Sequence, residues 1–494
     1  MKNDKEQTGL GMTEYHDTQE VYRELKNLIS IPARDLKPVE LQNYLTNYFE
    51  EKCKKSKIEF ERASKVIPGG VQHNQAFPYP FPIAFIKAKG AHLEDVDGNV
   101  YIDFLAAGGA TLLGSAPDIV CEKAKEVIDS CGPCTGVHHE YETLLAEFIV
   151  DRFPGIDKVR LLGSGTEAVM GAIRLARAHT KKKKIIKLGA GFHGWSDQVS
   201  YAQRISGIGG LESHGIPRAI YKHTQEVYPN DIDAMERMLK RNRYRGGTAA
   251  VIIEPMGPES GTRPLDYDYT AKVRTLCDKY GALLIFDEVV TGFRVGMSGA
   301  QGYFGVTPDL TTLGKIMAGG YPAAGALGGN NKVMESLAGG IGGKKGKKAH
   351  VGGTLAANPL SSMAGYITLS EMERTNACEV AAILGDRLTI GLKKLVKKYN
   401  LPFVAYNQGS MVHLETVGTV LFDINLFKFW ELPGKIKEIH KRKDIMTHMG
   451  AAYMAEGLVT VGGSRMFTTA AMNNEIIDDA ITRFERVFQK VEGV

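Results

Sequence analysis

The sequence predicts an α/β protein, in which helices cover both faces of a mainly parallel β-sheet and a second, smaller α+β domain accompanies it. Two observations support this fold class. Short apolar runs typical of buried strands alternate with helix-length segments from about residue 135 to 370, and such alternation is typical of parallel sheets. The last 120 or so residues combine amphipathic helical patterns with short strands. The clearest predicted strands are residues 158–162, 184–188, 249–254 and 282–288.

Composition and breaks in periodicity divide the chain into four parts. They are an N-terminal helical extension (residues 1–60), the first part of the smaller domain (61–134), the large domain (135–370) and the rest of the smaller domain (371–494). The extension is rich in charge and places Leu25, Leu28 and Ile29 at helical spacing. Asp97-Gly98 is a strong turn signal between two alternating strands, and it predicts a β-hairpin over residues 91–104.

Composition and charge exclude several classes of protein. The 494 residues are 43% apolar and 24% charged, which is typical of a globular protein. A net charge of +5 is small for this length and gives no case for nucleic acid as a partner. No apolar run approaches the roughly 20 residues of a membrane span, and the polar first residues lack a signal-peptide core, so we expect a cytoplasmic protein. The lysine-rich runs 181–184 and 344–348 are expected to be solvated loops.

Cysteine and histidine spacing gives little support for a redox or metal function. Cys131 and Cys134 have the spacing of a redox motif, but such a motif opens a helix, whereas a helical pattern precedes these cysteines. His138 and His139 lie nearby, but no second ligand pair has the spacing of a structural zinc site. We therefore expect a loop of reduced cysteines and no metal.

The most informative feature is an acid and a lysine at the ends of two predicted strands. Asp287 closes the apolar run 282–288, and Lys315 lies 28 residues later, after a second apolar stretch at residues 309–313. Parallel strands gather ligand-binding groups at their carboxyl ends, so we expect the two side chains to lie together. This pair suits pyridoxal phosphate, because the lysine forms a Schiff base with its aldehyde and the carboxylate keeps its pyridine nitrogen protonated.

A phosphate site is predicted independently of this pair. The strand 158–162 is followed by a turn with Ser164, Gly165 and Thr166, and then by a helical pattern. A helix that begins in this way points free backbone N–H groups at an anion, and the two hydroxyls add donors. Alone the pattern is weak, because a serine before a helix is usually only an N-cap.

Other strand ends are expected to supply the rest of the site. Phe192 and His193 follow the strand that ends at Leu188, and an aromatic side chain there can stack on a planar ring. Glu254 ends the next strand, so we expect it at the same edge of the sheet. Thr354 offers a further hydroxyl. Glycines just before it suggest a mobile active-site loop, and they are Gly339, Gly340, Gly342 and Gly343.

These segments resemble the class III aminotransferases of the fold type I superfamily, and they are most similar to the glutamate-1-semialdehyde aminomutase branch. The similarity covers roughly residues 60 to 490. The matching stretches are residues 90–104, 163–178, 192–194, 254–255, 285–294, 299–320 and 353–359. The resemblance implies a large domain with a mainly parallel seven-stranded sheet, a smaller α+β domain, and a homodimer whose subunits share their active sites.

The resemblance also implies roles for individual residues. Lys315 is expected to carry the cofactor and Asp287 to contact its pyridine nitrogen. Val289 is expected under the cofactor ring and Phe192 over it. The phosphate ligands that the resemblance implies are Ser164, Gly165 and Thr166, with Thr354 reaching the phosphate held by the partner subunit.

Two departures from the aminomutase pattern concern the substrate. In the aminomutases the loop after Pro-Gly-Gly-Val carries an arginine for the substrate carboxylate, whereas residues 70–77 of this chain contain none. Near the C-terminus, where the aminomutases have a glutamate, this chain has Arg465. We expect Arg465, helped by His73, to bind a substrate carboxylate, because guanidinium holds carboxylate in a bidentate fork.

The expected function is that of a pyridoxal phosphate-dependent aminotransferase. It moves an amino group between an amino acid, or a related amine, and a keto acid. The Lys315 amine is expected to move the substrate proton, a general acid–base step worth roughly 10²–10⁴-fold. An aminomutase of the glutamate-1-semialdehyde type, which moves the amine within one molecule, and a racemase are the alternatives.

Overall fold

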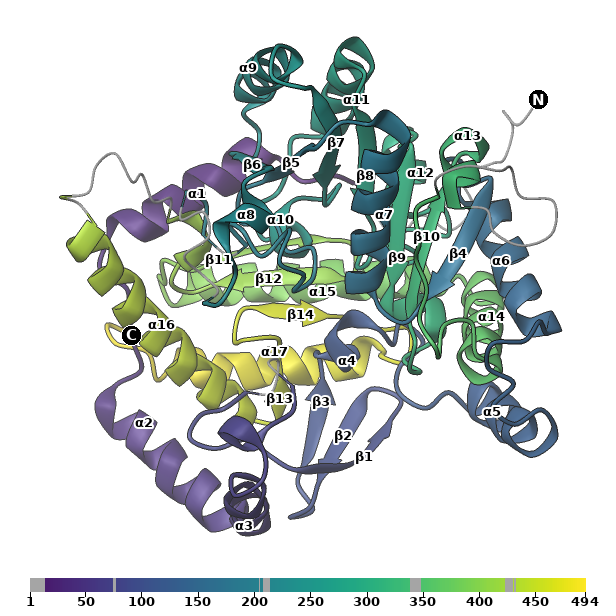
Figure 1. Ribbon diagram of the computed structural model, residues 1–494. Helices are drawn as coiled ribbons and strands as arrows, with labels where there is room; N and C mark the ends of the chain where they lie inside the picture. The colour runs from purple at the N-terminus through teal and green to yellow at the C-terminus, as the bar shows by residue number, and fades with distance from the viewer. Residues whose placement is uncertain are drawn as a thin grey trace. The chain divides into compact units, whose positions relative to one another are not determined.

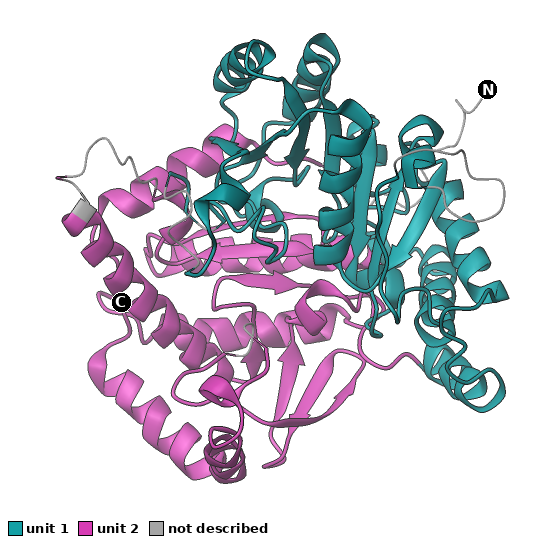
Figure 2. Cartoon of the chain, in the orientation of Figure 1, with its two compact units in different colours: residues 1–11, 118–379, 423–429 teal, residues 12–117, 380–422, 430–494 magenta. Residues whose placement is uncertain are grey.

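The computed structural model describes residues 14–73, 77–203, 205–207, 214–337, 348–422, 430 and 432–494. The chain forms two compact units (Figure 2). Among the described residues, the first unit comprises those between 118 and 379, and the second comprises those within 14–117, 380–422 and 430–494. Each unit therefore has its own hydrophobic core and is described by itself below.

The first unit is built on a seven-stranded sheet (Figure 1). Its order is β4 (Lys158–Leu162), β10 (Gly325–Gly329), β9 (Leu310–Gly314), β8 (Leu283–Asp287), β7 (Thr248–Ile253), β5 (Lys184–Leu188) and β6 (Thr224–Val227). All neighbouring strands run parallel except in the two pairs that β10 forms. The predicted α/β fold with a mainly parallel seven-stranded sheet is confirmed.

Alternate residues of the strands face different helices. On one face Ile252 and Ile285 pack against α7 (Gly165–Thr180), where Ile173 is buried. On the other face Ile253 and Phe286 pack against two helices, α9 (Ile232–Arg243) and α11 (Tyr269–Tyr280). Because both faces are covered, these strands are apolar throughout, which explains the continuous runs in the sequence. Figure 1 shows α7 lying along the sheet.

The other helices of the first unit surround this sheet. They are α5 (Asp118–Ser130), α6 (Glu140–Arg152), α8 (Arg218–Tyr221), α10 (Pro258–Gly261), α12 (Gly299–Phe304), η3 (Lys315–Ala318), α13 (Asn331–Met334), η4 (Glu335–Leu337) and α14 (Pro359–Arg374). The lysine run 181–184 is more than the solvated loop that we expected. Lys182 donates to the carbonyl of Gly281, and Lys184 begins β5 and donates to the carbonyl of Arg245. Most of the second lysine run lies outside the described residues.

The second unit contains two smaller sheets. One has the order β1 (Phe85–Lys89), β2 (His92–Asp95), β3 (Val100–Asp103) and β13 (Leu458–Val459), and the other has the order β11 (Val404–Gln408), β12 (Met411–Glu415) and β14 (Arg465–Phe467). The antiparallel pair β2–β3 is the predicted hairpin, with Gly98 in a left-handed conformation at the turn. The helices are α1 (Thr18–Ser30), α2 (Pro38–Tyr44), η1 (Leu45–Glu50), α3 (Lys54–Ala63), η2 (Pro68–Gly70), α4 (Ala106–Gly109), α15 (Ala377–Lys398), η5 (Thr419–Leu421), α16 (Leu432–Ala455) and α17 (Asn474–Phe488).

The N-terminal helical segment packs into the core of the second unit. Leu25 and Leu28 of α1 are buried against Val404 and Tyr406 of β11. Arg442 of α16 is buried and donates to the carbonyls of Val417 and Ile31, each at 2.7 Å. The bond to Ile31 therefore satisfies a carbonyl at the end of α1, which a helix end leaves without an intrahelical partner, and the bond to Val417 joins that end to the segment after β12.

The described helices also bear on membrane association. None of the helices in the described part of the chain is both long enough and apolar enough to cross a membrane.

Candidate active site

Asp287 and Lys315 lie at the carboxyl ends of the neighbouring parallel strands β8 and β9. Asp287 is the last residue of β8, and its Cα partner on β9 is Thr312. The carboxylate is buried and accepts hydrogen bonds from Thr312 Oγ1 at 3.1 Å and from the N–H of Val289 at 3.2 Å. Lys315 directly follows β9 and begins η3. The two strands therefore deliver an anion and an amine to one edge of the sheet.

Lys315 adopts an uncommon backbone conformation. Its φ angle is +51°, in the left-handed region that residues other than glycine rarely occupy. A non-glycine residue there costs on the order of 1–3 kcal/mol, and such residues cluster at functional sites. Gly314, just before it, has no room for a side chain, since a Cβ there would lie 3.0 Å from Val289 Cγ1 and 3.2 Å from the carbonyl oxygen of Ala324. Close packing on both sides thus fixes the turn that carries the lysine.

His193 holds the other oxygen of Asp287. Its Nδ1 lies 2.6 Å from Asp287 Oδ2, and both side chains are buried. Burial lowers the pKa of His193, against the raising effect of its bond to Asp287. A neutral imidazole that donates from Nδ1 to a carboxylate keeps Nε2 as an acceptor. In the described structure His193 Nε2 is buried and has no hydrogen-bond partner.

The predicted strand, turn and helix start are present around Ser164, and the role of this turn in binding phosphate stays a prediction. Ser164 is the N-cap of α7 and its Oγ accepts from the N–H of Glu167 at 3.2 Å, so the simpler N-cap interpretation also holds. Helix geometry leaves the N–H groups of Gly165 and Thr166 without intrahelical partners. A Cβ on Gly165 would lie 2.9 Å from Val289 Cγ2, so the turn packs against Val289.

The loop that carries Phe192 and His193 approaches the same turn. Gly194 has a φ angle of +85°, and a Cβ there would lie 2.4 Å from Thr166 Oγ1. The Phe192 side chain is 45% exposed, although its neighbours in the chain are buried. Lys187 of β5 is fully buried and its Nζ donates to the carbonyls of Gly191 and Tyr201, each at 2.7 Å. The loop is therefore held at its base while it presents an aromatic ring.

Glu254 follows β7 at the same edge of the sheet and is also buried. Its Oε1 accepts from the N–H of Phe192 at 2.9 Å and of Glu259 at 3.0 Å, and its Oε2 accepts from the N–H of Ser260 at 2.8 Å. Burial and then the nearby charge of Asp287 raise the pKa of Glu254 to about 7. The carboxylate is thus engaged mainly by the protein's own backbone.

The remaining predicted residues lie on other segments of the chain. Thr354 belongs to the first unit and is exposed, next to Gly353, where a Cβ would lie 3.2 Å from Glu167 Oε2. Arg465 and His73 belong to the second unit, where Arg465 begins β14 and His73 is exposed, and their role stays a prediction. Residues 74–76 of the substrate loop and the predicted glycine loop at 339–343 lie outside the described residues.

Sequence reasoning missed two contributors to this site. Thr312 binds Asp287 from the neighbouring strand, and Lys187 anchors the loop that follows β5. The signal in each case is a polar residue inside an apolar strand, since Lys187 stands among Ile185, Ile186 and Leu188. A buried charge in such a strand must be paired or hydrogen-bonded, so it indicates a structured loop at the strand end.

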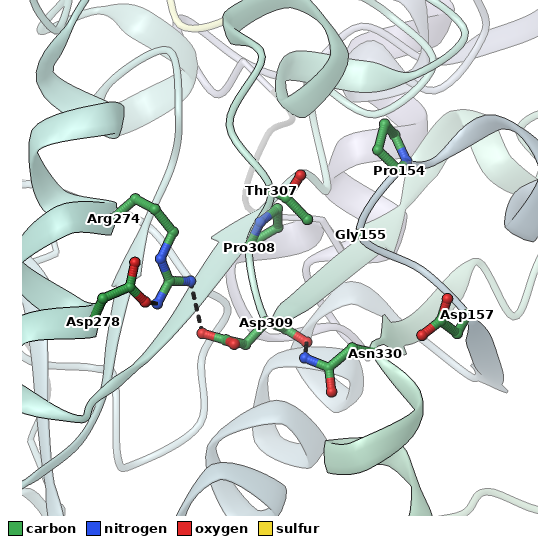
Figure 3. A pocket seen from close by; sticks show the side chains of 9 residues that line it. All are labelled: Pro154, Gly155, Asp157, Arg274, Asp278, Thr307, Pro308, Asp309 and Asn330. Carbon is green, nitrogen blue, oxygen red and sulfur yellow. Dashed lines mark hydrogen bonds and ion pairs between the residues drawn. The ribbon is translucent and has the colours of Figure 1, made fainter. Parts of the chain in front are cut away.

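A cavity of about 290 Å³ lies at the opposite end of the strands (Figure 3). Asp309, which lines it, precedes β9, whereas Lys315 follows that strand. At about 3.3 Å per residue the strand separates them by roughly 20 Å. Arg274 bridges Asp309 at 2.7 Å and Asp278 at 2.6 Å within the cavity wall. The cavity is therefore distinct from the cluster around Asp287.

The candidate redox and metal residues form no second site in the part of the chain that the structure describes. Cys131 follows the C-terminal end of α5, and the thiols of Cys131 and Cys134 are free. His139 is the N-cap of α6, and His138 contacts Glu142. Among the described residues, no three His, Cys, Asp or Glu side chains are placed to hold a metal ion.

Comparison with known proteins agrees with this geometry. Residues 74–487 match the aminotransferase class-III family. The chain is 36% identical over 449 residues to glutamate-1-semialdehyde 2,1-aminomutase 2 of Shouchella clausii, a match that covers 88% of this chain and 98% of the relative. The chain therefore belongs to the class III aminotransferase family, and it is a pyridoxal phosphate-dependent enzyme of fold type I.

Solved structures share the fold. An omega-transaminase from Sphaerobacter thermophilus aligns with a TM-score of 0.79 at 28% identity, over 90% of this chain and 99% of that chain. A transaminase with PLP bound aligns with a TM-score of 0.77 at 26% identity, over 88% of this chain and 97% of that chain.

The residues present fit pyridoxal phosphate. Asp287 is a buried acid held in one orientation by His193 and Thr312, as a partner for a pyridine nitrogen must be. Gly165 and Gly314 both lie against Val289. Because neither glycine carries a side chain, the three segments can form one closely packed surface. When bound, pyridoxal phosphate supplies an aldehyde that reacts with amines and a ring that withdraws electrons from the adjacent carbon.

Proposed function

We propose that this enzyme moves an amino group within a single substrate, as a 2,1-aminomutase of the glutamate-1-semialdehyde type. The similarity to the Shouchella clausii aminomutase carries this proposal, because it extends over 98% of that relative. The placement of Lys315 beside Asp287 supports it, since amino-group transfer needs a lysine amine and a fixed anion at the cofactor.

Each residue of the cluster then has a defined task. Lys315 holds the cofactor covalently at rest, and its freed amine carries a proton to and from the substrate carbon. With the cofactor bound, Asp287 would keep its pyridine nitrogen protonated, and Val289 and Phe192 would hold the two faces of its ring. The N–H groups of residues 165–166 and the hydroxyls of Ser164 and Thr166 hold the phosphate.

An aminotransferase that uses an amino acid and a keto acid is the second candidate. Two observations favour it. Residues 70–77 contain no arginine, where the resemblance to the aminomutases implies one for the substrate, and Arg465 stands where that resemblance implies a glutamate. We propose that Arg465, helped by His73, binds the substrate carboxylate in either reaction, because a guanidinium forms bidentate bonds with carboxylate.

The two candidates differ in their need for a second substrate. We expect purified holoenzyme to convert glutamate-1-semialdehyde to 5-aminolevulinate with no added keto acid, measured by chromatography of the product. A parallel set of reactions combines amino acid donors with keto acid acceptors. Turnover only in the paired reactions would contradict the aminomutase and support the aminotransferase.

We further propose that the enzyme is a homodimer in which Thr354 reaches the phosphate held by the partner subunit. The exposure of Thr354 and Leu355 supports this, since Leu355 is an apolar side chain that is 64% exposed. Sedimentation is expected to give twice the chain mass of 54.0 kDa. A monomer with full activity would contradict this assembly.

A further inference from the structure

Glu254 joins two segments of the site that are far apart in the sequence. Its carboxylate accepts the N–H of Phe192 from the loop after β5, at 2.9 Å. It also accepts the N–H groups of Glu259 and Ser260 from the turn after β7, at 3.0 and 2.8 Å. The side chain is only 7% exposed, so water offers little competition for these three bonds.

The turn after β7 has a conformation that requires such a partner. Glu259 and Ser260 have φ angles of 57° and 60°, and consecutive left-handed residues that carry a Cβ are disfavoured. Gly257 has a φ angle of 116°, and a Cβ there would lie 2.1 Å from the carbonyl oxygen of Arg263. Successive N–H groups turned inward in this way form a concave anion site. Here the anion is the carboxylate of Glu254 itself.

The loop on the other side of Glu254 leads directly to Asp287. Phe192 is bound to Glu254 through its N–H, and the next residue, His193, is bound to Asp287 at 2.6 Å. A Cβ on Gly191 would lie 3.2 Å from His193 Nε2 and 3.6 Å from Glu254 Oε1. Tight packing therefore couples the position of the Glu254 carboxylate to both residues of the loop.

Glu254 and Asp287 also occupy equivalent places on adjacent strands. Ile253 pairs with Phe286 in the parallel pair β7–β8, so the next residue of each strand continues the register. Neighbouring strands lie about 4.8 Å apart, and both carboxylates are buried. The charged groups that face Glu254 are Asp287 from β8 and Glu259 from its own turn. Lys187 of β5 acts on His193 at the other end of the network.

We propose that Glu254 is a positioning residue that acts through Phe192 and His193, and that it releases a proton when a cation binds at Asp287. The inference rests on the proposed role of Asp287 as partner of the pyridine nitrogen. A positive charge beside Asp287 offsets the repulsion between the two carboxylates, so Glu254 ionises and its proton passes to solvent. The ionised carboxylate then accepts all three N–H groups more strongly, because charge-assisted hydrogen bonds are the stronger ones. The elevated pKa of Glu254 agrees with this coupling.

The experiment compares cofactor binding to the apo forms of the wild type and of Glu254→Gln. Calorimetry at pH 7 in two buffers of different ionisation enthalpy gives the protons released per cofactor bound. We expect the wild type to release more protons than the variant, by up to about half a proton per cofactor, because a carboxyl whose pKa is about 7 is about half protonated at pH 7. We expect the variant to bind the cofactor roughly 10–100-fold more weakly. Equal proton release in both proteins would overturn the coupling.

Two further variants separate positioning from loss of a buried acid. Glu288 is fully buried and accepts the N–H of Ala300 at 2.6 Å and the Thr291 hydroxyl at 3.0 Å, contacts unconnected with Phe192. We expect Glu288→Gln to lower Tm but to release as many protons as the wild type. Glu254→Asp keeps the charge on a shorter side chain, so proton release should persist while the affinity for the cofactor falls. If Glu254→Gln does not fold, the test is made with Glu254→Asp. Unchanged affinity in Glu254→Asp would overturn the positioning role.

Measurements of cofactor binding and of turnover separate a failure of this inference from a failure of the proposed function. If the wild type carries the cofactor on Lys315 and turns over substrate while both Glu254 variants bind cofactor as it does, only the present inference is wrong. If the wild type binds cofactor with the expected proton release but moves no amino group, only the proposed function is wrong.

Discussion

At the scale of the residue, Asp287 is held by more contacts than an ordinary surface carboxylate. Thr312 Oγ1, the N–H of Val289 and His193 Nδ1 all lie within 3.2 Å of its oxygens. These contacts satisfy a buried charge that would otherwise be costly, and they leave its orientation fixed. The aspartate and the lysine could be predicted from the sequence because each ends an apolar run. The histidine's role as its partner could not, because it depends on how the loop after β5 folds back.

Asp287→Asn is expected to keep the fold and to lose most activity. The amide is isosteric but neutral, so it cannot hold a proton on the pyridine nitrogen. A loss of about 3 kcal/mol of charge stabilisation lowers kcat roughly 100-fold. Steady-state kinetics measure the loss, and Asp233→Asn, at an exposed position of α9, is the control. Near wild-type turnover in the Asp287 variant would contradict the assignment.

Arg465→Ala is expected to raise KM for substrates that carry a carboxylate. A hydrogen-bonded charge pair contributes about 1.5–3 kcal/mol, so KM should rise roughly 10–200-fold. Simple amines without a carboxylate should be unaffected. Arg387, in an exposed ion pair with Asp478, is the control arginine for the same substitution. Normal handling of amino acids by the Arg465 variant would mean that other groups bind the carboxylate.

Glu415 is expected to make the fold less stable as pH rises towards neutrality. It is 1% exposed, and burial raises its pKa from 4.5 to about 7, against the lowering effect of Arg465. Between these values the folded state binds more protons than the unfolded state, so the free energy of unfolding falls as pH rises from about 4.5 to 7 and is flat above. The total change is on the order of 3 kcal/mol at about 1.4 kcal/mol per pKa unit.

Denaturant unfolding at several pH values measures this effect. Glu415→Gln should lose that part of the slope, because its side chain does not titrate. Glu50→Gln, at an exposed position of the N-terminal segment, should leave the slope unchanged. A Glu415 variant with the wild-type slope would show that this carboxyl titrates normally.

At the scale of the element, the strands and the start of α7 could be predicted closely from the sequence. Runs 158–162 and 184–188 coincide with β4 and β5. These strands could be predicted because burial on both faces makes a strand apolar throughout. The turn after β7 could not be predicted, since its two left-handed residues, Glu259 and Ser260, are types that rarely adopt that conformation. Its shape depends on the carboxylate of Glu254, which precedes Glu259 by five residues and Ser260 by six.

Close packing between elements makes a prediction for β10. A Cβ at Gly325 would lie 2.3 Å from the carbonyl oxygen of Ser164, so the strand lies directly against the phosphate turn. Gly325→Ala is expected to lower the free energy of unfolding by about 1–3 kcal/mol through overpacking, and to weaken cofactor binding. Thermal unfolding and cofactor titration measure the two effects.

The control for this substitution lies in an open helix. Gly434 in α16 is exposed and has nothing within 4 Å of its Cβ position. Gly434→Ala should be neutral or slightly stabilising, because alanine favours helix by up to about 1 kcal/mol. If Gly325→Ala proves equally harmless, the turn is less closely packed than the structure indicates.

At the scale of the whole molecule, the second unit draws on three separate stretches of the chain. Its cores combine residues from α1 with β11, and from β3 with β13. Pairings between residues more than 350 positions apart leave no local pattern in the sequence, so the assignment of the N-terminal segment to this unit could not be predicted. The first unit lies mostly within one continuous stretch of the chain. For this reason the large sheet and the residues at its edge could be predicted.

The central claim is that Lys315 carries pyridoxal phosphate at the edge of this sheet. Borohydride reduction of the holoenzyme, followed by proteolysis and mass spectrometry, tests it most directly because reduction makes the linkage permanent. We predict a single phosphopyridoxyl adduct, on Lys315, and no adduct in Lys315→Ala. An adduct on any other lysine of the wild-type enzyme would contradict the account.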